Sequence, residues 1–451
     1  MPIKIEFHNY LCYAVFEVND VLIEFSFKNF RSFRDEAILS MEAAGLGGRK
    51  SCLIEFKNYK LLPAAAIFGK NGGGKSNVIR AFWLAVQFIR NAQRTQHENA
   101  EVPVIPFLLD DFSYSKPTEF HFIYSVDGIK YWYGFSATKK KIVTEYLYHA
   151  PNGQKALVFE RSETYTFTED KAKRTLISKT VAANQLFFSM ACTMNDNACI
   201  QAMRWFREYV LFSRDYADIP SQIIENFEDK SMLQAVSNYA VAADVGIESM
   251  RFEVNSAEID SENELPDDMP EPLKKAFIQF MQVLSENTND AETRLKMGQL
   301  SAKAAHRGTS QKGKQGLYEL DLADESDGTR KLMALAPAIE SALRKGGVLL
   351  VDEIERELHP ILVNLIISKF QSKRTNPNGA QIIFTTHNVE LMNLELLRKD
   401  QIYLVDKKQE DGASDLYSIS DFTTRTTDNI RKGYFIGKFG AVPDVEIEEV
   451  E

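Results

Sequence analysis

Apolar residues recur along the chain with two different periods, and the period changes from one segment to the next. Residues 21–28 (VLIEFSFK) alternate apolar and polar side chains, which is typical of a strand, and residues 29–41 predict a turn into a second strand. Residues 61–69 (LLPAAAIFG) are a buried-type apolar run that ends at a glycine. Residues 77–92 then repeat apolar side chains at helical spacing. The first hundred residues therefore predict two strands followed by a strand–turn–helix unit.

The middle of the chain has a different pattern. Residues 103–160 are rich in Tyr, Phe and Val, and Asp127-Gly128 lies between two apolar runs like a hairpin turn, which predicts an antiparallel sheet. From about 185 to 300 the spacing is mainly helical, interrupted by an acidic stretch at 258–272 that predicts an exposed loop. A polar segment at 303–316 follows, for which we predict a flexible loop.

After residue 318 the pattern alternates again between helix and strand. The predicted elements are a helix at 329–344, a strand at 346–353, a helix at 360–372, a strand at 380–387, and strands near 401–405 and 415–419. Two α/β regions thus lie at the two ends of the sequence, with a large insertion between them.

Composition and charge narrow the protein class. The 451 residues correspond to about three domains of roughly 150 residues. A net charge of -10 argues against a generally basic protein that coats nucleic acid, although it leaves room for a local basic groove. There is no apolar run of membrane-spanning length, no secretory signal, and no CxxC pair among Cys12, Cys52, Cys192 and Cys199. We therefore expect a cytoplasmic protein without membrane contact.

The glycine-rich turn after residue 68 satisfies the GxxxxGK[ST] pattern, with a predicted strand before it and a helix after it. Glycines there let backbone N–H groups surround a phosphate, Lys75 would reach the β- and γ-phosphates, and the Ser76 hydroxyl would bind Mg²⁺. The alternative is a chance match in a turn, which the flanking elements disfavour. The pattern predicts ATP and Mg²⁺ as ligands, with Asn71, Gly72, Gly73, Gly74, Lys75, Ser76 and Asn77 as the nucleotide-binding residues.

Residues 348–353 are an apolar strand that ends in two acids. Asp352 is placed to hold Mg²⁺ through water, and Glu353 to polarise the attacking water as a catalytic base. Strands often end in solvated acids, so this signal alone would be ambiguous. The phosphate-binding pattern far upstream favours the functional interpretation.

Two further segments extend this set. Ser326 and Gly328 precede a predicted helix and would present a hydroxyl and free N–H groups to an anion. Because the chain already has one phosphate cradle, they suggest contact with the γ-phosphate of ATP bound to another copy; the alternative is an ordinary helix cap. His387 ends the next strand, where it could sense the γ-phosphate, although many such histidines only pack or cap. Its position after Asp352-Glu353 favours the switch role.

The glycine loop, the Ser326 segment, the Asp352-Glu353 strand end and His387, in this order, resemble the motifs of the ABC-type ATPases, including the SMC and OLD-like heads. Other segments resemble the RloA / AbiL-type AAA-family ATPases of bacterial restriction and phage-defence loci, over about residues 21 to 443. The segments that carry this resemblance are DEIERELHP (352–360), QIIFTTHN (381–388), RKDQIYLV (398–405), SDLYSISDF (414–422) and GYFIGKFGAVP (433–443).

The resemblance implies an α/β fold: an ABC-type P-loop ATPase head split by an inserted antiparallel β-sheet and a helical region. It assigns Lys75 and Ser76 to phosphate and Mg²⁺, Asp352 to Mg²⁺, Glu353 to the base, Ser326 and Gly328 to a trans signature, and His387 to the switch. The expected parts are an extension at 1–20 that need not be native, an N-terminal ATPase half at 21–100, an antiparallel β lobe at 101–160, a mainly helical insertion at 161–317, and a C-terminal ATPase half at 318–451.

The chain departs from the ABC-type pattern in two places. The signature reads SDGTR where transporters have SGGQ, and no Q-loop glutamine is identifiable, so Asp110 is the candidate for that position.

Three residues after Glu353 resemble metal ligands: Glu355, Glu357 and His359. We interpret them instead as helix-start acids and a neighbour of a helix cap. Five basic residues before the signature fit either contact with nucleic acid or phosphate, or a solvated loop: Lys303, His306, Arg307, Lys312 and Lys314.

The function expected from this resemblance is an ATPase that acts as a sensor or gate. A homodimer or higher homo-oligomer would enclose ATP and regulate a companion effector, expected to be nuclease-like, in anti-phage defence. One alternative is a DNA-processing ATPase of the SMC or OLD kind that acts on DNA ends. Another is an ATP-binding scaffold with little turnover, which the presence of Glu353 disfavours.

Overall fold

The fold was taken from a computed structural model, which describes residues 6–7, 10–11, 20–95, 100–213, 228–243, 246–258, 296–423 and 429–442. Two compact units are present: one comprises Met1–Ser213 and Ala338–Glu451, and the other Arg214–Pro337. Most of the extension at 1–20 and nearly all of the acidic stretch at 258–272 lie outside the described residues. The segment from about 185 to 300, predicted to be mainly helical, is described except for residues 214–227, 244–245 and 259–295.

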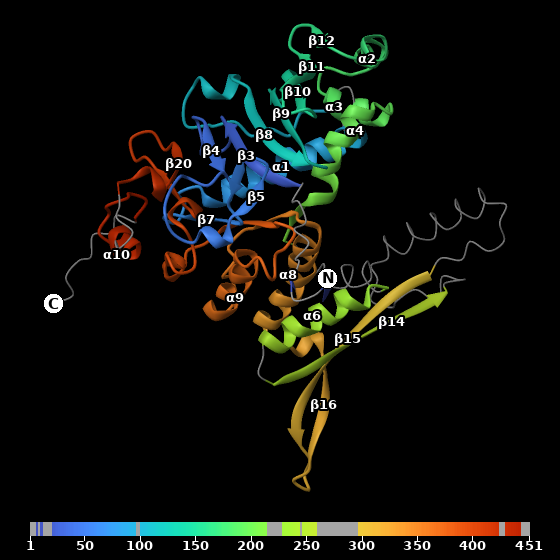
Figure 1. The fold of residues 1–451 in the computed structure, drawn as a ribbon, viewed down its shortest axis with the longest axis vertical. Helices are drawn as coiled ribbons and strands as arrows, with labels where there is room; N and C mark the ends of the chain where they lie inside the picture. Colours follow the sequence, from blue (N-terminus) through green and yellow to red (C-terminus); the bar gives the residue numbers. More distant parts are fainter. Residues whose placement is uncertain are drawn as a thin grey trace. The chain divides into compact units, whose positions relative to one another are not determined.

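The larger unit contains a six-stranded sheet that is parallel except at one edge (Figure 1). In the register, Ile383 lies between Leu350 on one neighbouring strand and Ala65 on the other. Because these strands run in the same direction, their carboxyl ends meet at one edge of the sheet. The strand order is β13 (Val210–Phe212), β17 (Val348–Val351), β18 (Gln381–Thr385), β7 (Ala64–Phe68), β19 (Ile402–Lys407) and β20 (Ser414–Ser418), with β20 antiparallel.

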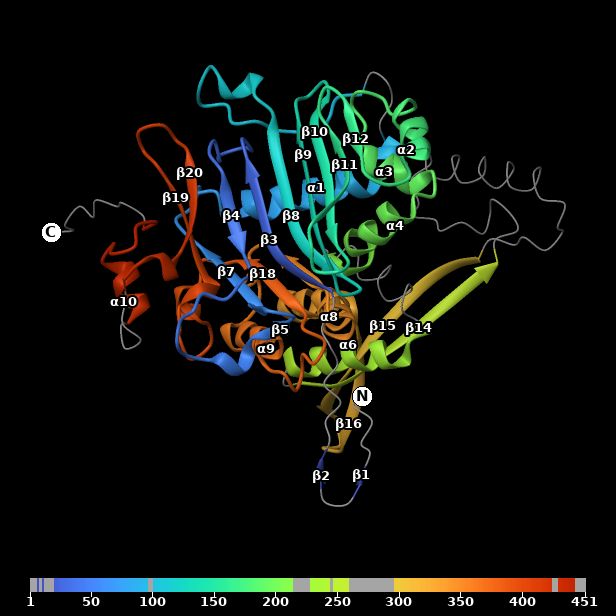
Figure 2. The ribbon, with the colours of Figure 1, turned by 45° about the horizontal axis from the view of Figure 1, so that its top comes forward.

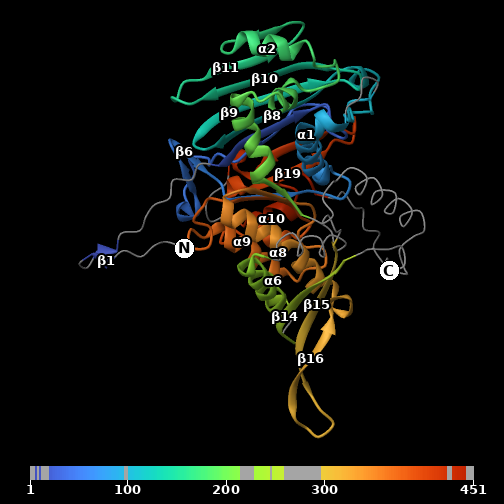
Figure 3. The same cartoon turned by 90° about the vertical axis from the view of Figure 1, so that its right-hand side faces the viewer.

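The predicted strand–turn–helix unit is confirmed, since β7 leads into α1 (Lys75–Thr95). The predicted helices near the C-terminal end are also present, as α8 (Asp327–Lys345) and α9 (Pro360–Gln371). Helix α1 covers one face of the six-stranded sheet and α9 the other (Figure 3). The division between the two units falls within α8.

A second, seven-stranded antiparallel sheet confirms the antiparallel pairing predicted for residues 103–160, and the turn at Asp127-Gly128 joins two of its strands. The predicted boundary at residue 100 is not a boundary of this sheet, because β3 pairs with β8 along Val21–Lys28. The strand order is β12 (Tyr165–Phe167), β11 (Ala156–Arg161), β10 (Ile142–Ala150), β9 (Ile129–Ala137), β8 (Thr118–Val126), β3 (Val21–Lys28) and β4 (Ala37–Ser40).

The hydrophobic core of the larger unit joins both sheets to α1. The Phe82 ring of α1 lies 4.7 Å from that of Phe25 and 5.3 Å from that of Phe122, measured between ring centroids. This burial fixes the direction of α1, and with it the loop that precedes the helix. The remaining elements of this unit are β1 (Glu6–Phe7), β2 (Tyr10–Leu11), β5 (Ile54–Phe56), β6 (Tyr59–Leu61), α2 (Lys171–Ser178), α3 (Phe187–Thr193), α4 (Asn197–Arg204) and α10 (Ile430–Phe435).

Within the insertion at 161–317 that we predicted to be mainly helical, α2, α3, α4 and α6 (Lys230–Ala243) are helices, but the smaller unit also contains strands that the prediction lacks. In that unit, α6 packs on a three-stranded antiparallel sheet made of β14 (Ile247–Glu258), β15 (Lys296–Thr309) and β16 (Gln315–Asp321) (Figure 2). The polar segment at 303–316 is therefore part of a hairpin and not a loop. Ala304 is buried there, and β15 pairs with β14 on one side and with β16 on the other, which gives this polar segment its backbone hydrogen bonds.

Candidate nucleotide-binding site

The loop between β7 and α1 requires glycine at two close contacts. Gly69 has φ +149°, and a Cβ there would lie 2.3 Å from the Val405 carbonyl oxygen. Gly74 has φ +115°, and a Cβ there would lie 2.7 Å from Ser32 Oγ. At Gly72, in contrast, no described atom lies within 4 Å of such a Cβ. The loop is thus closed on its inner side and open at Gly72, which suits a loop that receives phosphate groups.

Neighbouring polar groups hold this loop in place. Ser414 Oγ donates to the Gly73 carbonyl (2.6 Å), and the Ser414 N–H donates to the Ser32 carbonyl (2.7 Å). The amide of Asn77 donates to Ser32 Oγ (2.9 Å), and the nucleotide contact of Asn77 stays a prediction. Sequence reasoning did not identify Ser32 or Ser414, because nothing in the local pattern links them to the glycine loop.

Lys75 is 5% exposed and its ammonium group is folded back onto the loop. Its Nζ donates to the carbonyls of Gly69 (2.8 Å) and Lys70 (3.2 Å) and contacts Nδ1 of His387 (3.3 Å). Burial lowers the pKa of Lys75, and the carboxylates of Glu355, Glu353 and Asp352 offset this effect in part. Ser76 follows in the first turn of α1 and is partly exposed. A phosphate entering the loop would find this cation already in position.

Asp352 and Glu353 follow β17, where a buried threonine of β18 holds both. Thr385 Oγ1 donates to Asp352 Oδ1 (2.6 Å) and accepts the N–H of Glu353 (2.7 Å). Glu353 takes φ +51°, which turns the chain sharply at this point. We did not identify Thr385 from the sequence; the available signal was a pair of threonines that ends an otherwise apolar strand.

His387 completes the cluster from the end of β18. Its Nε2 lies 3.9 Å from Glu353 Oε1, and its other ring nitrogen faces Lys75. Strands β17, β18 and β7 are adjacent and parallel, so their carboxyl ends bring Lys75, Asp352, Glu353 and His387 together. These residues meet in one place although more than 300 positions separate the first from the last. Their roles in binding and hydrolysis remain predictions.

The three metal-like residues after Glu353 have different environments. His359 Nδ1 accepts the N–H of Ile361 (3.3 Å) and so caps α9, which confirms the structural interpretation. Glu357 is exposed beside Arg356. Glu355 is not a helix-start acid, which corrects our interpretation: it accepts the backbone N–H of His387. Within the described residues, no group of three or more His, Cys, Asp or Glu side chains is arranged to hold a metal ion.

The signature segment lies in the smaller unit and has its own local contacts. Ser326 is exposed, and its Oγ accepts the N–H of Thr329 (3.2 Å) at the start of α8. Glu325, just before it, is buried and pairs with Nε2 of His306 (2.7 Å). Gly328 is partly exposed. Within one chain Ser326 thus acts as a helix cap, and contact with a second copy remains a prediction.

Two other candidate groups have structural partners. Asp110 accepts the N–H groups of Phe112 (3.1 Å) and Ser113 (2.6 Å), so it stabilises a local turn, and its Q-loop role remains a prediction. Among the five basic residues, His306 contacts Glu325, and Arg307 Nε lies 2.6 Å from Glu248. Acidic side chains of the same unit therefore lie beside two of the five basic residues and offset part of their positive charge.

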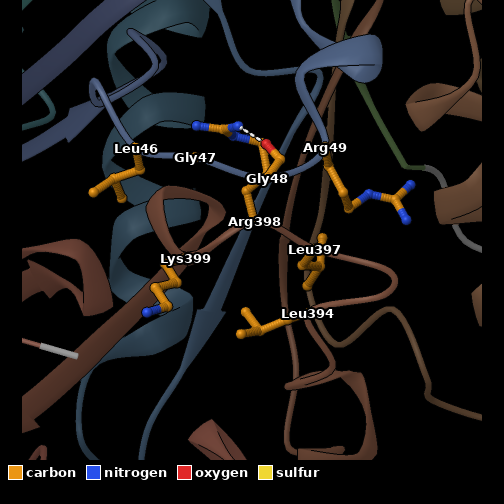
Figure 4. Close-up of a pocket in the computed structure, with 8 residues that line it drawn as sticks. All are labelled: Leu46, Gly47, Gly48, Arg49, Leu394, Leu397, Arg398 and Lys399. Carbon is orange, nitrogen blue, oxygen red and sulfur yellow. Dashed lines mark hydrogen bonds between the residues drawn. The ribbon is translucent and has the colours of Figure 1, made fainter. Parts of the chain in front are cut away.

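A cavity of 210 Å³ lies away from these residues (Figure 4). Leu397 and Lys399 in its wall precede β19, whereas the glycine loop meets the other end of β19 at Val405. Arg398 crosses the cavity to the Gly48 carbonyl and also pairs with Asp400 (2.7 Å). None of the predicted site residues lines this cavity. Its lining residues are Leu46, Gly47, Gly48, Arg49, Leu394, Leu397, Arg398 and Lys399.

One sequence family matches more than half of the chain. The family described as "AAA domain, putative AbiEii toxin, Type IV TA system" matches residues 64–393. No curated protein matches the chain. No helix of the described residues has the length and apolar character needed to cross a membrane.

Several solved structures resemble the chain at low similarity. They include an Smc head bound to the C-winged helix domain of ScpA (14% identity, TM-score 0.41, covering 88% of this chain and 97% of that one). An Smc head with an extended coiled coil from Pyrococcus furiosus is 14% identical (TM-score 0.36, 93% and 99%). The recombination mediator RecF with ATP is also 14% identical (TM-score 0.37, 90% and 99%). Similarity at this level assigns no activity.

Proposed function

The chain belongs to the AAA-domain family whose description names the AbiEii toxin, and we propose that it binds and hydrolyses ATP at composite sites formed by two copies. Its fold is α/β, an ABC-type P-loop ATPase head with an inserted antiparallel sheet, as the sequence predicts. The observation that carries the proposal is the meeting of Lys75, Asp352, Glu353 and His387 at the carboxyl ends of three adjacent parallel strands.

Each group has a chemical task in this proposal. The N–H groups of the glycine loop and the ammonium of Lys75 bind the phosphates. Ser76 and Asp352 hold Mg²⁺, which neutralises phosphate charge when bound. Glu353 accepts a proton from the attacking water, while Thr385 fixes its main chain. His387 lies beside both Lys75 and Glu353 and responds to the γ-phosphate.

A second copy supplies the signature in this proposal. Ser326 is exposed at the start of a 19-residue helix, whose N-terminal dipole favours an anion. The chain has its own phosphate loop, so this second anion-binding group is available to the nucleotide of a partner. The protein would then be a homodimer or a higher homo-oligomer.

The cellular role we propose is regulation of a companion effector in anti-phage defence, with ATP hydrolysis as the gate. Support comes from the family description, which names a toxin and a toxin–antitoxin system, and from the resemblance to RloA / AbiL-type ATPases. The effector is expected to be nuclease-like. DNA-end processing has less support, because the acids Glu325 and Glu248 pair with two of the basic residues of the hairpin.

Steady-state ATP hydrolysis by the purified chain tests the proposal, with light scattering to record self-association. We expect Mg²⁺-dependent turnover that stops on chelation, falls at least about 100-fold in Glu353→Gln, and accompanies ATP-promoted association. Equal turnover in both proteins would remove Glu353 from its role. Bound ATP without turnover, and without any response to added partner or DNA, would favour a scaffold.

A further inference from the structure

The backbone at Glu355 is held in place by hydrogen bonds and burial of the residues next to it. Ile354, just before it, is fully buried, and its N–H donates to the Thr385 carbonyl (3.1 Å). Three residues later, the N–H of Leu358 donates back to the carbonyl of Glu355 (3.0 Å). The turn that carries Asp352 and Glu353 therefore also fixes the origin of the Glu355 side chain.

The two oxygens of the Glu355 carboxylate have different surroundings. Oε1 accepts the backbone N–H of His387, whereas Oε2 is buried and has no hydrogen-bond partner among the described residues. A buried, unpaired carboxylate oxygen is costly unless a charge compensates it. The pKa of Lys75 is lowered first by burial, and among the carboxylates that offset this effect Glu355 acts most strongly, ahead of Glu353 and Asp352.

We propose that Glu355 is a positioning residue of this site, which fixes the main chain of His387 by a hydrogen bond and competes with phosphate for Lys75 by its charge. This inference rests on the ATPase function proposed above. The inference gives a role to Glu355, which the sequence motifs do not assign to the site.

The geometry around His387 shows how the two effects combine. Lys75 can only donate, so Nδ1 of His387 is an acceptor and the ring carries its proton on Nε2, which faces Glu353. A phosphate that binds Lys75 withdraws the ammonium from His387. Glu355 still holds the N–H of His387, so the ring is released while its main chain stays in place.

Two substitutions separate the charge from the hydrogen bond. Glu355→Gln keeps an acceptor for the N–H of His387 but removes the negative charge, so we expect ATP to bind about 3- to 10-fold more tightly, with kcat lowered by less than about 5-fold. Glu355→Ala removes both, so we expect the same tightening together with a kcat lowered about 10- to 100-fold. A defect in folding would lower ATP affinity and turnover together, whereas this variant is expected to raise the affinity and lower the turnover.

The matched control is Glu357→Gln, which removes the same charge from an exposed side chain of the same loop and should change neither quantity. Equilibrium binding of a fluorescent ATPγS analogue and single-turnover hydrolysis, with the full-length chain, provide the two readouts. Thermal unfolding checks the fold of each variant.

The outcomes distinguish this inference from the ATPase proposal. Wild-type turnover with unchanged binding and kcat in Glu355→Ala would overturn the role of Glu355 and leave the ATPase proposal intact. Loss of binding, turnover and thermal stability together in both variants would also overturn it. If the wild type shows no turnover, the ATPase proposal fails; tighter ATPγS binding by Glu355→Gln would then still support the charge effect, and unchanged affinity would contradict it.

Discussion

The phosphate-loop edge of the six-stranded sheet and the signature segment of the smaller unit differ in what one chain provides. At the sheet edge, Lys75, Thr385 and Glu355 connect groups from three strands into one network. At the signature, Ser326 caps its own helix, and Glu325 pairs with a neighbour in its own sheet–helix unit. A single chain thus brings together the proposed base, the proposed Mg²⁺ ligands and the glycine loop, but leaves the signature residue Ser326 exposed.

This difference has a consequence for binding and turnover. Nucleotide binding depends on groups that one copy already holds in place, so it should persist in an isolated chain. Turnover depends, in our proposal, on a second copy that brings Ser326 to the γ-phosphate. Substitutions at the two regions should therefore separate binding from hydrolysis.

The largest expected effect comes from Lys75→Met at the sheet edge. Removing the ammonium that donates to the carbonyls of Gly69 and Lys70 should lower ATP affinity and turnover together, the latter at least about 100-fold. Lys70→Met is the control, because Lys70 lies in the same loop but pairs with Asp406 (3.2 Å). Its turnover should stay within about 3-fold of wild type, since the ammonium of Lys70 is directed to Asp406 and has no role in the proposed phosphate contacts. Equal losses in both variants would show that only the shape of the loop matters.

The next effect concerns the signature, where two substitutions keep the helix cap but differ in charge. Asp and Asn are both good caps, so Ser326→Asp and Ser326→Asn should unfold at about the same temperature. Ser326→Asp places a negative charge toward the phosphate of the partner, and we expect turnover to fall at least about 10-fold with ATP binding retained. Ser326→Asn should stay within about 3-fold. Indistinguishable turnover of the two variants would reduce Ser326 to a cap.

Thr385→Val tests the hydroxyl group at the sheet edge, because threonine and valine side chains have the same shape. It leaves Asp352 Oδ1 and the N–H of Glu353 without their partner, so we expect turnover to fall about 10-fold and stability by about 1–3 kcal/mol. Thr386→Val is the matched control, because its hydroxyl accepts the N–H of Asn388 (3.0 Å) and not a group of Asp352 or Glu353. Chemical denaturation and turnover assays give both quantities. Wild-type turnover in Thr385→Val would mean that β17 alone positions the two acids.

The smallest effect on turnover is expected from Glu325→Gln in the smaller unit. Removing the buried charge beside His306 should lower stability by about 1–3 kcal/mol, while turnover changes by less than about 3-fold. Glu319→Gln, on the exposed strand β16, is the control and should leave stability almost unchanged. A large loss of turnover without loss of stability would instead place Glu325 in the chemistry.

Much of the fold and the site follows from local pattern. Buried apolar runs ending in glycine, in Asp352-Glu353 and in His387 predicted three strands, and parallel pairing then brings their ends together. Thr385 and Glu355 could not be recognised in this way, because their importance depends on contacts across strands that have no trace in spacing. The hairpin of β15 and β16 was missed for a similar reason: residues 303–316 are polar and contain glycine, which is typical of a loop, and only the pairing of β15 with β14 and β16 determines their conformation.

The composite site is tested most directly by mixing two inactive variants, Lys75→Met and Ser326→Asp. In a mixed pair one site carries both defects and the other carries neither, so turnover should return to about a quarter of the wild-type rate after the copies exchange. Each variant alone should remain inactive at the same concentration. Absence of any recovery, with exchange of copies verified by light scattering and labelled chains, would contradict the account that ATP is hydrolysed between two copies.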